Sequence, residues 1–139
     1  MASSHYFYGG NPMKYDYFYG PQSESFAFYR VPRVLIKSKE FKPLSPYAKL
    51  LYGLLLDRMN LSFKNKWFDD QGRVYVYYTV AEICEDFGCS RVTAGKLLAE
   101  LDAHGGFGLI ERIKQGYGKP DKIYVKHLFS LTGSQDFSK

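Results

Sequence analysis

The sequence predicts an α+β fold in which two short helices precede a β-hairpin. Two segments with helical periodicity, each opened by a residue type that caps helices, lie at 79–88 and 90–105 and are joined by a very short turn. Two strand patterns follow at 109–115 and 121–125, on either side of a loop rich in glycine. Because this is the order of a helix-turn-helix followed by a wing, we predict a winged helix-turn-helix with an N-terminal strand and arm extension.

The first helix of the pair is predicted to begin at Thr79. The Thr79 hydroxyl can accept a hydrogen bond from the Glu82 amide while the Glu82 carboxylate reaches back, which is a capping box. Gly88 can take the left-handed conformation that ends a helix. Apolar residues recur between them at the i, i+3, i+4, i+7 spacing of one buried stripe, namely Val80, Ile83, Cys84 and Phe87.

The second helix is predicted to begin after the cap residue Ser90 and to end near Gly105. So short a joint between two helices requires them to cross steeply. The buried stripe of this helix is formed by Ala94, Leu97, Leu98 and Leu101.

The outward face of the second helix is small or basic at its N-terminal end, and its acids, Glu100 and Asp102, come later. Recognition helices read base edges with their N-terminal residues, where the helix dipole is also positive. Arg91 is the best candidate for a guanine contact, because its planar fork can satisfy two acceptors. The alternative is an ordinary surface helix with a charged face. The residues predicted to enter a major groove are Ser90, Arg91, Thr93 and Lys96.

The hairpin predicted at Leu109–Gln115 and Asp121–Val125 carries an excess of basic residues. In its second strand, Ile123 and Val125 alternate with polar or basic side chains, which indicates one apolar and one basic-aromatic face. Glycines in the loop permit close approach to a phosphate backbone. The alternative is a hairpin that only increases solubility. The residues predicted to contact the DNA backbone or minor groove are Lys114, Tyr117, Lys119 and Lys122.

Composition narrows the classes of partner. The net charge of +5 and the isoelectric point near 9.1 indicate an anionic partner, and double-stranded DNA is the leading candidate. No apolar run is long enough to span a bilayer, and the N-terminus lacks a secretory signal, so we expect a cytoplasmic protein without membrane contact.

Catalysis and metal binding are not expected. The histidines at 5, 104 and 127 are scattered, and neither a phosphate-binding loop nor a paired nucleophile is present. Cys84 and Cys89 form a single C-x4-C pair, which offers too few ligands for structural zinc. We therefore predict a binding protein with no cofactor and no metal.

The first twenty residues form an aromatic arm that carries a repeat, Tyr6-Phe7-Tyr8-Gly9 and Tyr17-Phe18-Tyr19-Gly20. Rings are costly to leave in water, so we expect the arm to pack on its own domain or on a second copy. Two alternatives stay open: a mobile tail that is partly of non-native origin, and a platform on which nucleic-acid bases stack.

Between the arm and the helix pair, the sequence predicts a short strand, a basic run and a core helix. Ser25–Val31 is the strand, stopped by Pro32. The basic run reads either as a second phosphate-contact surface or as a solvated stretch; it contains Arg30, Arg33, Lys37, Lys39 and Lys42.

The core helix is predicted to open at Ser45-Pro46 and to lapse near Asn60. A loop to Gly72 and a strand at Val74–Tyr78, which would join the hairpin in one sheet, follow it. The inward residues of this helix are predicted to be Tyr47, Leu50, Leu51, Leu54, Leu55 and Met59, and the narrow polar stripe to be Lys49, Gly53, Asp57 and Asn60.

Four stretches, 26–32, 44–59, 67–75 and 108–116, closely resemble the N-terminal domain of the plasmid replication initiator A (RepA) family of Gram-positive bacteria. The resemblance covers roughly 17–129 and is most specific in the phrase that runs from Leu50 to Met59. It implies a plasmid replication initiator that binds repeated sites in an origin and is followed by a C-terminal domain that engages host replication proteins.

The resemblance also implies a homodimer formed through N-terminal elements, which we assign to Tyr17, Phe18, Tyr19, Phe26 and Phe28. On this reading, residues 21–130 are the DNA-binding domain and 131–139 are a tail or the start of a linker. Two rival functions remain: a winged-helix scaffold module of a primosome, and a transcriptional regulator.

Overall fold

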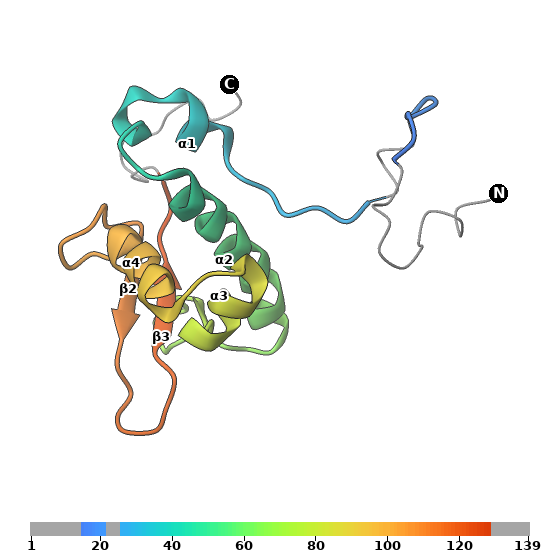
Figure 1. The fold of residues 1–139 in the computed structure, drawn as a ribbon. Helices are drawn as coiled ribbons and strands as arrows, with labels where there is room; N and C mark the ends of the chain where they lie inside the picture. The colour runs from blue at the N-terminus through green and yellow to red at the C-terminus, as the bar shows by residue number, and fades with distance from the viewer. Residues whose placement is uncertain (1–14, 22–25, 129–139) are drawn as a thin grey trace.

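The computed structural model describes residues 15–21 and 26–128. The chain forms a group of helices and one small antiparallel sheet, and the N-terminal segment extends away from them (Figure 1). In the described residues, no helix has the combination of length and apolar character that crossing a bilayer needs. The elements are α1 (Arg33–Lys37), the 3-10 helix η3 (Lys39–Phe41), α2 (Pro46–Lys64), β1 (Tyr75–Val76), α3 (Val80–Phe87), α4 (Arg91–Leu101), β2 (Ile110–Ile113) and β3 (Lys122–Val125).

Helix α2 is the centre of the core and begins where the sequence predicts. The Ser45 hydroxyl accepts a hydrogen bond from the Ala48 amide at 3.2 Å, so Ser45 caps the helix as expected. The helix runs four residues past Asn60, to Lys64. Its buried side chains meet those of α3, α4 and the sheet in one cluster that includes Leu51, Leu55, Val76, Ile83, Leu98, Leu101, Ile110 and Ile123.

The predicted inward face of α2 is wrong at its edges. Tyr47 is 62% exposed and Leu50 is 37% exposed, whereas Lys49 and Gly53 are buried. The buried arc is rotated because the chain at Arg30 crosses the helix: a Cβ on Gly53 would lie 2.8 Å from the Arg30 carbonyl oxygen. The face of α2 that was predicted to be a polar stripe is therefore covered at Gly53 by the backbone of Arg30.

The strand predicted at Ser25–Val31 is also wrong, and a helix was missed. Residues 27–32 have no regular structure, and they reach no edge of the sheet. Directly after them, α1 and η3 bury Leu35 and Phe41 among exposed lysines and arginines. Leu35 and Phe41 hold α1 and η3 on the core. From the sequence, only the basic residues of this stretch were considered, and this contact was not predicted.

The sheet has the strand order β1-β3-β2, and both pairings are antiparallel. The strand predicted at Val74–Tyr78 is confirmed in shortened form as β1, which pairs Tyr75 with Tyr124 of β3. The hairpin of β2 and β3 is confirmed too. Ile123 faces the core while Lys122 and Tyr124 lie half-buried on the other face, as the alternation predicts.

The C-terminal turn of α4 is tied to two other elements by its acids, which the sequence had left on the surface. The Ser45 amide and hydroxyl both donate to the Glu100 carboxylate, at 2.6 and 2.8 Å. The Asp102 carboxylate accepts bonds from Nε and an amino group of Arg112, both at 2.8 Å. Helix α4 therefore ends at Leu101, earlier than the predicted Gly105, because Asp102 turns into an extended conformation.

Asp102 is a buried charge with a partner. Its side chain is 5% exposed, and burial by itself would raise the pKa of the carboxyl. The hydrogen bonds and positive charge of Arg112 outweigh that effect, so the pKa of Asp102 lies below its ordinary value. A carboxyl with a depressed pKa in the folded state stabilises the protein above its unfolded pKa, and that stability is lost as the pH falls.

We predict that Arg112→Met lowers the free energy of unfolding by about 3 kcal/mol, because it leaves the Asp102 charge buried without its partner. Urea denaturation at pH 7 measures this difference. As the pH falls toward the pKa of an unfolded aspartate, the gap between the two proteins should narrow, since protonation removes the charge in both. A gap that stays constant down to pH 3 would show that the pair does not control stability.

Candidate nucleic-acid interface

The turn between α3 and α4 is fixed by local hydrogen bonds that the sequence predicts. The Thr79 hydroxyl accepts from the Glu82 amide at 3.1 Å, and the Glu82 carboxylate accepts from the Thr79 amide at 2.9 Å, so the capping box is confirmed. Gly88 has a φ of +67°, and its amide and that of Cys89 both donate to the Cys84 carbonyl. The start of α4 is thereby held at a defined angle to α3.

Ser90 and Thr93 cap α4 together. The Ser90 hydroxyl accepts from the Thr93 amide and donates to the Thr93 hydroxyl, both at 3.1 Å. Thr93 is half-buried as a result, while Ser90 is exposed. Both side chains, which were predicted to enter a groove, therefore help to fix the start of the helix; the Ser90 O–H donor is used in this way, whereas that of Thr93 is not.

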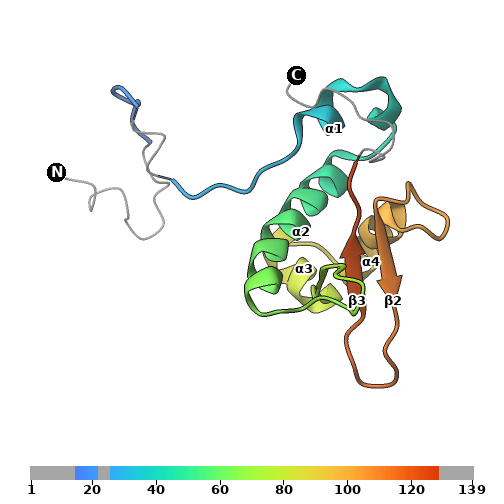
Figure 2. The same ribbon diagram turned by 180° about the vertical axis from the view of Figure 1, so that it is seen from behind.

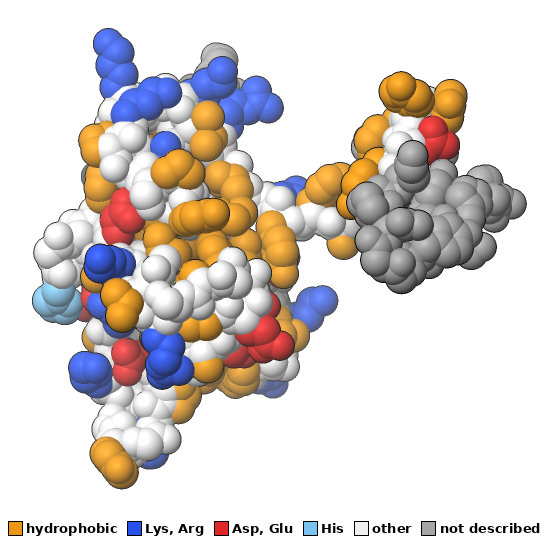
Figure 3. Space-filling view, in the orientation of Figure 1, with side chains coloured by type: hydrophobic (Ala, Val, Ile, Leu, Met, Phe, Trp, Pro, Cys, Tyr) orange, Lys and Arg blue, Asp and Glu red, His pale blue; other side chains and the backbone are white. Residues whose placement is uncertain are grey.

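Arg91 and Lys96 are the exposed cations of α4. Among the residues that the structure describes, neither makes an ion pair. Val92 lies beside Arg91 and is 67% exposed, and Gly95 has open space where a Cβ would stand. Lysine and arginine side chains are grouped over α4 and the hairpin on this face of the molecule (Figure 3). This part of the helix presents small, cationic and methyl-bearing groups to the outside.

The hairpin loop projects from the domain beside α4 (Figures 1 and 2). Gly116 and Gly118 have φ values of +122° and +77°, which other residues adopt only with strain. The Gln115 side-chain amide donates to the Pro120 carbonyl at 2.7 Å and closes the loop. Tyr117 is fully exposed, and Lys114 and Lys119 are exposed too, so these predicted contacts lie together on one projection.

Lys122 is placed apart from the other predicted hairpin contacts. Its ammonium group lies 4.5 Å from the centre of the Tyr75 ring, on the sheet face that points away from the core. Next to it, Arg73 bonds the Asp69 carboxylate at 2.8 Å. Burial would raise the pKa of Asp69, but hydrogen bonds from Arg73, Tyr124 and Gln71 lower it to about 2. Arg73 is therefore paired with Asp69, and the ammonium group of Lys122 is in cation–π contact with Tyr75.

The residues assigned to a dimer contact are exposed. The Phe26 ring makes edge contacts with the rings of Phe18 and Phe28, at 6.2 and 6.3 Å between centres. Figure 1 shows residues 15–21 extended away from the domain, so packing of this part of the arm on its own domain is wrong, whereas Phe28 lines a pocket with Gly53 and Leu56 of α2. A contact with a second copy stays a prediction, and the first aromatic repeat lies outside the described residues. The exposures of Tyr17, Phe18, Tyr19, Phe26 and Phe28 are 82%, 60%, 70%, 57% and 62%.

Val92 is not among the contact residues that the sequence predicts. Its exposure next to the helix N-terminus makes it a candidate for contact with a thymine methyl group. Its position, two residues after the N-cap Ser90, could have indicated this role from the sequence. Elsewhere in residues 15–21 and 26–128, no group of three or more histidine, cysteine or acidic side chains is arranged to hold a metal ion.

Solved structures with the same arrangement are similar to this chain in sequence as well. A structure described as a Rep-DNA complex is 30% identical, with a TM-score of 0.66 over 83% of this chain and 86% of that one. An N-terminal domain of a DNA-binding protein is 29% identical, with a TM-score of 0.65 over 84% and 87% of the two chains. An MDR initiator is 29% identical, with a TM-score of 0.61 over 81% and 86%.

Among curated proteins, a 41 kDa protein of Lactobacillus helveticus is 29% identical over 104 residues, which is 70% of this chain. This chain matches 29% of that protein's own length. The family model described as the replication initiator protein A (RepA) N-terminus matches residues 27–139. On this match, which extends over most of its length, the chain belongs to the RepA N-terminal domain family of replication initiators.

Proposed function

We propose that the domain is a winged helix that binds double-stranded DNA in a sequence-specific manner, with α4 as the recognition helix and the hairpin as the wing. The observation that carries the proposal is the distribution of charge on α4. Glu100 and the C-cap residue Asp102 are both engaged at the C-terminal end of the helix, whereas Arg91 and Lys96, toward its N-terminal end, make no ion pair with any residue that the structure describes. The similarity to a structure described as a Rep-DNA complex supports DNA binding by the domain.

In this mechanism, the N-terminal half of α4 enters a major groove. Arg91 donates two hydrogen bonds to a guanine, Val92 contacts a thymine methyl group, and Lys96 reaches a phosphate or a base edge. The Ser90 cap and Thr93 hold the backbone amides of the first turn toward the duplex, where they favour a phosphate oxygen. The loop cations Lys114 and Lys119, with Tyr117, lie along the flanking backbone.

We infer that the biological targets are repeats in a plasmid origin, bound by a dimer whose contacts involve the exposed rings between Tyr17 and Phe28. Two linked copies would read half-sites separated by an integral number of duplex turns. Further regions of the full protein would engage host replication proteins, and the domain itself would bind DNA in the cytoplasm without cutting it.

One observation favours a second candidate function, that of a protein-interaction module of a primosome. Val92 on α4 and Tyr47 on α2 are exposed apolar side chains, and the Tyr47 ring contacts that of Phe87 on α3. A transcriptional regulator would use the DNA face in the same way but on operator sites. A gel-shift titration with origin repeats, operator-like duplexes and scrambled duplex distinguishes the three, because a scaffold module would not discriminate among them.

We predict that Arg91→Ala relaxes the preference at one base position and weakens binding to the cognate repeat by about 1–3 kcal/mol, or roughly 5- to 150-fold. Fluorescence anisotropy against a set of duplexes, each with one base pair changed, measures this. Lys64→Ala, at the far end of α2, is the matched control and should leave the profile intact. Equal losses on every duplex would assign Arg91 to the backbone instead.

We predict that Lys119→Ala weakens binding to cognate and scrambled duplexes alike, because Lys119 neutralises a phosphate. The slope of log K against log salt should become shallower by about one unit. Lys122→Ala should change the slope less, since its ammonium group already has the Tyr75 ring as a cation–π partner. An unchanged slope in the Lys119 variant would refute the wing assignment.

A further inference from the structure

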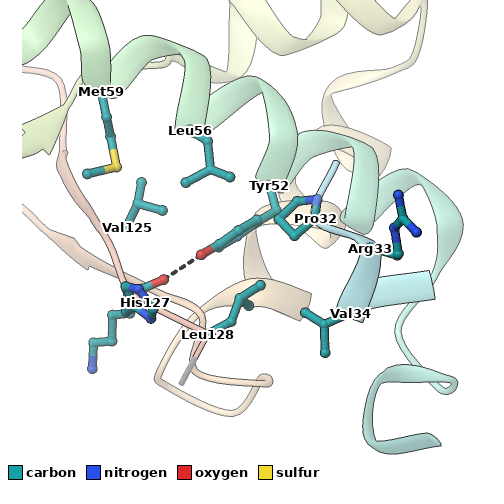
Figure 4. A pocket seen from close by; sticks show the side chains of 10 residues that line it. Pro32, Arg33, Val34, Tyr52, Leu56, Met59, Val125, His127 and Leu128 are labelled. Atoms are coloured by element: carbon teal, nitrogen blue, oxygen red, sulfur yellow. Dashed lines mark hydrogen bonds between the residues drawn. The ribbon is translucent and has the colours of Figure 1, made fainter. Parts of the chain in front are cut away.

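A cavity of about 430 Å³ opens beside α2, at a distance from the proposed DNA face. It is formed where three segments meet: the start of α1, the middle of α2 and the chain that follows β3 (Figure 4). Its volume is in the range of sites that bind small ligands or single side chains. Six of its residues give it an apolar surface: Val34, Tyr52, Leu56, Met59, Val125 and Leu128.

The Tyr52 hydroxyl, the polar group of the buried ring in the cavity wall, already has a hydrogen-bond partner. This side chain is 2% exposed, and its hydroxyl donates a hydrogen bond to the Lys126 carbonyl at 2.5 Å. Figure 4 shows this bond crossing from α2 to the chain after β3. Because the hydroxyl is engaged, Tyr52 offers only its ring to the cavity, and an apolar group there displaces water without breaking a bond.

The rim of the cavity is cationic. Arg33 and Lys126 line it and are exposed, and none of its ten lining residues is acidic. Lys37 and Lys39 are also exposed and follow in α1 and η3, and Glu40 is the one acid in the sequence between residues 26 and 45. A ligand that reaches this end of the domain therefore meets a positive field around an apolar opening.

The cavity and the hairpin loop lie at opposite ends of β3. The strand begins at Lys122, next to the loop, and ends at Val125, whose side chain lines the cavity. Figure 1 shows α1 and the hairpin loop at opposite ends of the domain. A ligand in the cavity would leave α4 and the loop free for a duplex.

We propose that this cavity is a docking site for an acidic peptide segment of a protein partner, which inserts one bulky apolar side chain between α1 and α2 and places carboxylates against Arg33 and Lys126. Charge complementarity selects an acidic ligand, and the apolar walls select a side chain of the leucine or phenylalanine type. A single-stranded nucleic acid fits less well, because the Tyr52 ring is buried and offers no stacking platform, and the His127 imidazole is the one other aromatic ring that lines the cavity.

The test is a selection of random ten-residue peptides, displayed on phage, against the whole chain. Selected sequences should share an excess of acidic residues and at least one bulky apolar residue. Synthetic copies of them, labelled with fluorescein, should bind more weakly as salt is raised. Leu56→Glu should weaken binding at least ten-fold, and Arg33→Glu, an exposed change that spares the core, several-fold. Leu61→Glu, on the same helix but outside the cavity and 57% exposed, should have no effect.

The result is separable from DNA binding. The Arg91→Ala variant and the duplex-bound protein should both bind the peptides with unchanged affinity. Selection that yields no peptides, peptides without acidic excess, or peptides insensitive to Arg33→Glu would overturn the proposal. It would equally be overturned if Leu56→Glu changed only the oligomeric state or only DNA affinity, since the occupant would then be a second copy or nucleic acid.

Discussion

The anchoring of the last turn of α4 is the constraint on which the proposed DNA face depends. Glu100 and Asp102 are two residues apart and bind in different directions, the first to the N-terminus of α2 and the second to Arg112 of β2. A carboxylate at the start of a helix is favoured by the helix dipole, and hydrogen bonds between an arginine and a carboxylate are strengthened by their charges. Together they fix the helix relative to both the core and the hairpin.

The connection after α4 strengthens this anchor. The amides of Phe107 and Leu109 donate to the carbonyls of Glu100 and Leu101, both at 2.8 Å, so the carbonyls that a helix end leaves open have partners. A Cβ on Gly106 would lie 2.3 Å from the Ala99 carbonyl oxygen, so only glycine fits where the chain turns back. The same contacts that hold α4 also withdraw its negative charge from the face proposed to meet DNA.

Features set by neighbouring residues could be predicted, and those set by distant partners could not. Thr79, Gly88 and Ser90 act through bonds within a few residues, so the helix pair and its turn follow from sequence. Glu100 and Ser45, in contrast, are 55 residues apart, and no local pattern shows that they meet. The orientation of α2 was missed for a similar reason: the chain at Arg30 covers Gly53, while Tyr47 remains outside. Among the candidate contacts, the positions of Arg91 and Lys96 follow from helical periodicity, but the cation–π contact of Lys122 depends on strand pairing.

The cavity and the proposed DNA face are connected through the same core elements. This connection raises the question of whether a ligand in the cavity would change the affinity for DNA. Helix α2 and strand β3 both contribute to the cavity wall, and both pack on the core that supports α4. Close-packed elements of this kind transmit a displacement only if they have a second stable arrangement. The Tyr52–Lys126 bond closes the wall from one element to the other. We therefore expect occupation of the cavity to add a partner to a DNA-bound domain without altering its affinity for the duplex.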